Sequence, residues 1–280
     1  MSEGFPLHEA AESGDVKRVE ELIAASHDDI SGNTLPLTSF REGKSAFSVA
    51  STPETKALLT DAFLELGNLR GDTNATERAC EEGDADLLAM LLENGKNTGA
   101  WGVSLDSCFE KAATQGHTSI LSLLVKEGID PVGNNGWPLV YAAEHGHAET
   151  VAFLAEAEGV DVGAMDGLAL AKAAENGHAD VVRVLAGTEG AYSDGRDPVR
   201  AAAKNGHVEA LKAVLEIPGA KVSNMAIRMA MRNNQAGALE ALLASGLADD
   251  DDVADAYEIA LDDDLADLVA VFQAAGISPP

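Results

Sequence analysis

One pattern of glycine, small residues and aliphatic residues recurs seven times along this chain of 280 residues. Each copy has a glycine or an asparagine as its origin, at Gly14, Gly83, Gly116, Gly146, Gly177, Gly206 and Asn234. Small residues usually stand three and four positions before the origin, and aliphatic residues stand five and eight positions after it. From Gly83 onward the origins are 33, 30, 31, 29 and 28 residues apart, a period typical of stacked repeats. The pattern therefore predicts a solenoid and argues against a closed globule.

Each copy reads as two short helices joined by a turn. A large apolar residue usually stands seven positions before the origin, and with the paired small residues it forms a stripe at helical spacing. The glycine at the origin can adopt the left-handed conformation that ends a helix and reverses the chain. A second glycine, 12 or 13 positions after the origin, is expected to close the second helix, as at Gly190. The unit is thus a helical hairpin that must stack on its neighbours.

Three segments of the chain closely resemble the repeats of a known protein family. Phe5–Ala11 reads FPLHEAA, Trp137–Ala143 reads WPLVYAA, and Asn176–Leu185 reads NGHADVVRVL. These segments resemble the ankyrin repeat family, whose repeats open on a T-P-L-H-x-A-A motif. The resemblance implies an all-α, ankyrin-like solenoid of stacked helix-turn-helix repeats, with short β-hairpins or loops projecting as fingers. It also implies that the chain functions by binding another protein.

The repeats cover nearly the whole chain, so residues 1–280 are predicted to form a single domain of about nine repeats. Two weaker units have Glu54 and Asp263 as their origins, which gives degenerate repeats near 40–70 and 250–280. Terminal repeats of a solenoid expose one face to water and are commonly atypical. A loop insertion is expected near 27–45, and an acidic C-terminal cap is expected at 249–267.

The charge is strongly negative, at -28 from 19 basic and 47 acidic residues. No Lys or Arg follows Arg232, and the final 48 residues carry 11 acidic side chains. Such a field repels nucleic acid and acidic lipid surfaces and attracts basic proteins. The expected partner is therefore another protein, with a basic surface as one form of it, and neither nucleic acid nor a membrane. The N-terminal residues do not form a signal peptide, so a cytoplasmic location is expected, with the nucleus as the alternative.

Several residue patterns in the sequence are candidates for metal binding, redox chemistry or catalysis. His117, His147, His178 and His207 each belong to a different repeat, so they cannot close one zinc shell and are expected to be structural residues of the inter-helix turn. Cys80 and Cys108 occupy apolar first-helix positions and are expected to be buried and reduced. The acidic run from Asp249 lacks the glycine and glutamate that a calcium loop requires. No metal site, cofactor or catalytic residue is predicted, and the chain is not expected to be an enzyme.

The connections between repeats offer better candidates for binding. Large aromatic or methionine side chains supply most of the energy at protein interfaces. One such side chain stands in each of four successive connections, and a tyrosine stands on the groove side of a first helix; the candidate binding residues are Trp101, Trp137, Tyr141, Met165 and Tyr192. Met165 and Tyr192 are expected to be the more exposed, because Trp137 could pack between repeats and Trp101 could cover a seam.

The first helices are expected to line a groove of mixed charge. Its predicted positions are Glu9, Glu12, Lys111, Gln115, Tyr141, Glu144, Lys172, Glu175, Ala201, Lys204 and Arg228. The favoured function is a scaffold or adaptor that binds a partner protein through this concave groove and the hairpin tips. The alternatives are an acidic inhibitor of a basic or nucleic-acid-binding protein, an enzyme with a pocket between repeats, and a purely structural spacer.

Overall fold

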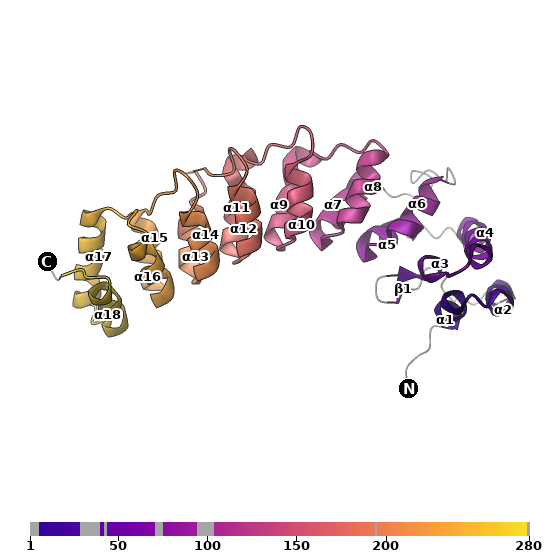
Figure 1. Ribbon diagram of the computed structural model, residues 1–280, viewed down its shortest axis with the longest axis horizontal. Helices are drawn as coiled ribbons and strands as arrows, with labels where there is room; N and C mark the ends of the chain where they lie inside the picture. The colour runs from indigo at the N-terminus through magenta and orange to yellow at the C-terminus, as the bar shows by residue number, and fades with distance from the viewer. Residues whose placement is uncertain are drawn as a thin grey trace. The chain divides into compact units, whose positions relative to one another are not determined.

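The computed structural model describes residues 6–28, 40–41, 44–70, 75–93, 104–193 and 195–278. It divides the chain into two compact units, unit 1 (Met1–Asp130) and unit 2 (Pro131–Pro280). The predicted fold class is confirmed, because both units consist of short helices that pack against their sequence neighbours (Figure 1). That the repeats form one continuous domain stays a prediction.

In unit 1, the elements are α1 (Pro6–Ser13), α2 (Val16–Asp28), β1 (Phe40–Arg41), β2 (Lys44–Ser45), α3 (Ala46–Val49), α4 (Pro53–Arg70), α5 (Ala75–Glu82), α6 (Ala85–Glu93), α7 (Leu105–Gln115) and α8 (Thr118–Lys126). The two strands pair antiparallel, with Phe40 opposite Ser45. They form the only strand pair in the described part of the chain. Most of the predicted insertion at 27–45 lies outside the described residues.

In unit 2, the elements are the 3-10 turn η2 (Asn134–Gly136) and α9 (Trp137–Glu144), α10 (Ala148–Ala155), α11 (Ala164–Glu175), α12 (Ala179–Ala186), α13 (Pro198–Asn205), α14 (Val208–Leu215), α15 (Asn224–Arg232), α16 (Ala236–Ala244), α17 (Asp250–Asp262) and α18 (Ala266–Ala274). The first helices α9, α11, α13, α15 and α17 contact one another in sequence, and the second helices α10, α12, α14, α16 and α18 form a parallel row. Unit 2 is therefore a two-layer stack of hairpins (Figure 1).

The core of each hairpin is thin because its inner residues are small. In α11 and α12, Ala173, Ala174, Val182 and Leu185 are all fully buried. Alanine at these positions lets the two layers approach closely, and the aliphatic side chains of the second helix fill the space between them. The sequence pattern thus identified the core correctly.

The turn between the two helices has the predicted left-handed residue. Gly146 has φ 82°, and Asn234 takes the same role with φ 52°. The last repeat differs by one position from the prediction, because Asp264, and not Asp263, has the left-handed conformation, with φ 52°. In the second repeat the break between helices falls at residues 50–52, so Glu54 lies in the first turn of α4 and is not an origin.

The expectation that both cysteines are reduced is wrong in this structure. Cys80 of α5 and Cys108 of α7 are joined by a disulfide bond, with their Cα atoms 5.5 Å apart. Both side chains are buried, as predicted. The two residues stand at different positions of their repeats, three before Gly83 and eight before Gly116, so the repeat pattern by itself does not show that they meet. Disulfide bonds are rare in the cytosol, so this bond bears on the expected cytoplasmic location, which stays a prediction.

Unit 1 also contains a buried carboxylate, both oxygens of which accept hydrogen bonds from other residues of the unit. Asp84 is 3% exposed and accepts hydrogen bonds from the backbone N–H groups of Ser45 (2.7 Å) and Leu87 (3.0 Å). The hydroxyl of Ser48 donates to the same carboxylate. These bonds cap α6 and tie it to α3, so Asp84 has a structural role and is not a catalytic candidate.

Candidate protein-binding surface

The connections of unit 2 pack against one another along one edge. Arg196 donates from Nε to the carbonyl oxygen of Met165 over 3.3 Å, and the Tyr192 hydroxyl accepts from the backbone N–H of Lys221 over 3.3 Å. The Ser223 hydroxyl donates to the Asp197 carboxylate over 2.9 Å. These contacts link successive connections between residues 161 and 223, which we call the loop edge. The edge is a continuous surface because each connection is held by the next.

Trp137 and Tyr141 form an aromatic pair at the first helix beside this edge. They are four residues apart on α9, which places them on one face of the helix. Their rings stack with centroids 5.3 Å apart, and Trp137 is 37% exposed. A large, partly exposed aromatic pair of this kind is typical of a binding surface.

Met165 and Tyr192 are less exposed than expected. Both are half-buried, so Trp137 is the more exposed side chain and the predicted order is reversed. The Tyr192 ring is held between connections by its hydrogen bond, which explains its burial. Met165 has φ 53° and begins a run of three left-handed residues that ends at Gly167. Trp101 lies outside the described residues.

Sequence reasoning missed Met225, which is 48% exposed at the start of α15. It stands nine residues before Asn234, just as Trp137 stands nine residues before Gly146. That equivalence is the signal that could have identified it. The start of the first helix is therefore a position where unit 2 exposes large apolar side chains.

The first helices also carry a repeated ion-pair arrangement. Lys172 lies 3.1 Å from the Glu144 carboxylate and 3.3 Å from that of Glu175. Hydrogen bonding to Glu144 is the main cause that raises the pKa of Lys172 above its ordinary value. In unit 1, Lys111 pairs in the same way with Glu77 and Glu81. Both lysines stand five residues before a glycine origin, so the pairing follows the repeat.

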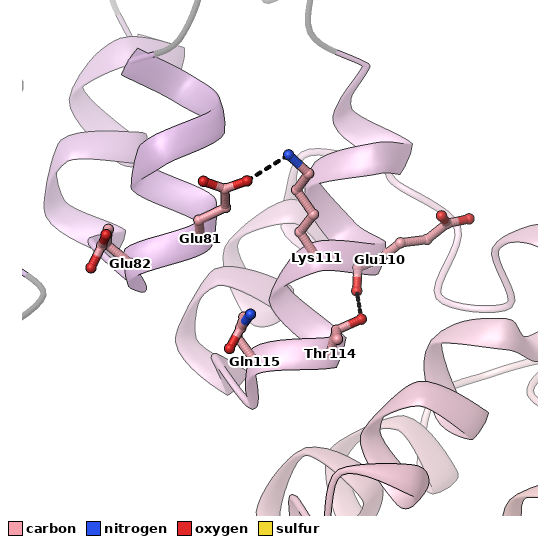
Figure 2. Close-up of a pocket in the computed structure, with 6 residues that line it drawn as sticks. All are labelled: Glu81, Glu82, Glu110, Lys111, Thr114 and Gln115. Carbon is pink, nitrogen blue, oxygen red and sulfur yellow. Dashed lines mark hydrogen bonds and ion pairs between the residues drawn. The ribbon is translucent and has the colours of Figure 1, made fainter.

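A shallow hollow of about 490 Å³ lies between α5 and α7 of unit 1. Its lining residues are Glu81, Glu82, Glu110, Lys111, Thr114 and Gln115 (Figure 2). Figure 2 shows the Lys111 ammonium directed at Glu81. The Lys111 Nζ atom lies 2.7 Å from the Glu81 carboxylate. Burial lowers the pKa of Lys111, but its bonds to the two glutamates outweigh this, so the pKa stays above its ordinary value. A lysine that acts as a general base needs a lowered pKa, so Lys111 is suited to structure and not to catalysis.

Two histidines of the turns, His117 and His178, have the expected structural role. The His117 ring Nε2 lies 2.8 Å from the carbonyl oxygen of Glu81, and that of His178 lies 2.9 Å from the carbonyl oxygen of Glu144. Each histidine therefore links its own turn to the preceding repeat. Among the described residues, no group of three His, Cys, Asp or Glu side chains is arranged to hold a metal ion.

Two residues of the acidic run at the start of α17 accept hydrogen bonds that stabilise the fold. Asp249 caps the helix by accepting from the backbone N–H of Asp251 over 3.0 Å, and Asp252 accepts from the Asn224 side chain over 2.7 Å. Acidic side chains in the first turn are also favoured by the helix dipole. Asp249 and Asp251 remain exposed and contribute to the negative surface.

Two layers of short helices, joined by left-handed turns and carrying exposed aromatic and methionine side chains, define a helical repeat protein. Residues 77–166 match the family model of ankyrin repeats in three copies, so this part of the chain is similar to that family, and the repeated helical hairpins of the structure are consistent with it. No curated protein matches the chain. Ankyrin repeats are generally protein–protein interaction modules. In the part of the chain that the structure describes, no helix combines the length and the apolar character needed to cross a membrane.

Proposed function

We propose that this chain binds a partner protein through the loop edge and the first-helix face of unit 2, as a scaffold or adaptor. The observation that carries the proposal is the stacked pair of Trp137 and Tyr141 beside the loop edge. Burial of such rings supplies most of the affinity in many interfaces, while charged residues around them set specificity and association rate. Met165, Tyr192 and Met225 extend the same surface. The mechanism needs no covalent step and no cofactor.

The surface is held in place before the partner arrives. Successive connections are hydrogen-bonded to each other, and each first helix packs on the next. A surface that is already ordered loses little conformational entropy when it binds, so more of the contact energy appears as affinity.

The test is capture from an extract of native cells, followed by measurement of direct binding between the purified proteins. A variant with Trp137→Ala and Tyr141→Ala is compared with the wild type and with a Leu261→Ala control. Leu261 is 42% exposed on α17, so its replacement removes an exposed apolar side chain elsewhere in unit 2. The proposal expects at least a tenfold loss of affinity in the double variant, equal to about 1.4 kcal/mol, and little change in the control. Equal affinities for all three proteins would refute it.

An acidic inhibitor of a basic protein is the second candidate. It is favoured by the exposed acids of α17 and by the lack of Lys and Arg after Arg232. This candidate expects binding that weakens steeply with salt and is lost when Asp249 to Asp252 are replaced by asparagine. Loss only in the aromatic variant, with weak dependence on salt, would favour the adaptor.

A further inference from the structure

Four cationic side chains form a regular array on two neighbouring first helices of unit 2. Arg200 and Lys204 lie on α13, and Arg228 and Arg232 lie on α15. Within each helix the two residues are four apart, so they share one face and are separated by about 6 Å along the axis. The array follows the repeat, because the members stand six and two positions before the origins Gly206 and Asn234.

The array faces solvent. All four side chains are exposed, whereas the opposite faces of α13 and α15 are buried through Ala202, Ala203, Ile227 and Ala230. The helices α13 and α15 pack directly against each other. Packed helices have axes about 8 to 10 Å apart, so the four charges fall within one small patch.

These cations are poorly neutralised by the protein itself. Among the described residues, Lys204 and Arg232 have no carboxylate within ion-pair distance. Arg228 donates to the amide oxygen of Asn224 at 3.5 Å, and Arg200 has Asp197 at 3.6 Å. In contrast, Lys172 on the neighbouring first helix is held by two glutamates. Most of the positive charge of the array is therefore available to interact with a bound external group.

The positive patch is unusual in a chain with 47 acidic and 19 basic residues. In salt of physiological strength, exposed charges are screened beyond about 8 Å, so acidic side chains farther than this from the patch contribute little to what it attracts. Apolar side chains lie beside them, since the exposed Met225 and the half-buried Met229 share α15 with Arg228 and Arg232. The patch thus offers charge and apolar contact together.

We propose that the array formed by Arg200, Lys204, Arg228 and Arg232 binds an acidic segment of the partner protein that also carries apolar side chains. Arg guanidinium groups can bind carboxylates through two parallel hydrogen bonds, which favours them at such sites. The inference rests on the proposed function. It adds that the segment of the partner that binds to the first-helix face is negatively charged. It is opposite in sign to the basic partner that the overall charge suggests.

The test measures the binding of a short fluorescein-labelled peptide of glutamate and leucine to the full chain by fluorescence anisotropy. The reference peptide has glutamine in place of glutamate. The array variant carries Lys204→Gln and Arg232→Gln, which break no ion pair among the described residues. The control carries Arg183→Gln and Lys212→Gln, which remove one arginine and one lysine from the second helices α12 and α14 of the same unit.

We expect the wild type to prefer the acidic peptide over the glutamine peptide and the array variant to bind it about five- to tenfold more weakly. The control should stay within twofold of the wild type, and a Lys204→Arg, Arg232→Lys variant should retain binding. Equal binding of the two peptides, or equal loss in the array and control variants, would overturn the inference. Equally tight binding of a single-stranded DNA oligomer, or salt-sensitive self-association that the array variant abolishes, would also overturn it.

Failure of this inference can be distinguished experimentally from failure of the proposed function. If the array variant captures the same partner with unchanged affinity while the Trp137 and Tyr141 variant loses it, the adaptor function stands and the acidic-segment inference fails.

Discussion

Reduction of the disulfide bond between Cys80 and Cys108 is expected to destabilise unit 1 and to leave unit 2 unchanged. The bond joins the neighbouring first helices α5 and α7 and closes a loop of 28 residues. In the chain-entropy account, a cross-link of this length restricts the unfolded chain by an amount worth about 3.6 kcal/mol at 25 °C. In a repeat protein each hairpin contacts only its neighbours, so this loss should remain local.

The assay is native-state hydrogen exchange, followed by mass spectrometry of peptides from α7 and α13. A loss of about 3.6 kcal/mol corresponds to a ~400-fold increase in the open population of α7 after reduction. The same comparison on a Cys80→Ala, Cys108→Ala variant serves as the control, because reductant should not affect it. Two titratable thiols in the unfolded, unreduced protein would refute the bond itself. A fall of less than about 1 kcal/mol at α7, or an equal fall at α13, would refute the energetic reasoning.

Further predictions concern single residues of unit 2 and can be checked by chemical denaturation. Gly146→Ala should lower the free energy of unfolding by at least about 1 kcal/mol more than Gly190→Ala. Both glycines have a left-handed φ, but only the Cβ added at position 146 would meet a ring, at 2.6 Å from Nδ1 of His178. Equal effects of the two substitutions would contradict this reasoning. Asp166→Gly should stabilise by about 0.5 kcal/mol, since Asp166 is exposed and has φ 59°; a loss of stability would show that its side chain matters more than its backbone. Lys172→Gln should cost about 0.5 to 1 kcal/mol at pH 7. Because the folded pKa of this lysine is raised, the difference from wild type should vanish as the pH rises through that pKa, and a difference that persists above it would exclude the ion pair as its cause.

The candidate surface was only partly predictable. The sequence offered Trp137 and Tyr141 as separate candidates, one in a connection and one on a first helix, and the stacking of their rings was not predicted. Their exposure relative to Met165 and Tyr192 was not visible, because it depends on how each connection packs on the next. The Tyr192 hydroxyl, for example, is held by a backbone group 29 residues away.

The sequence by itself determined the period, the hairpin unit and the buried residues of each repeat. These properties depend on local spacing, since a stripe of Ala173, Ala174 and Leu185 can be buried only if helices form and stack. Only the tertiary structure decided which side chains meet across repeats. Cys80 and Cys108 come together because stacking places helices about 10 Å apart, and this contact depends on side-chain direction as well as sequence spacing.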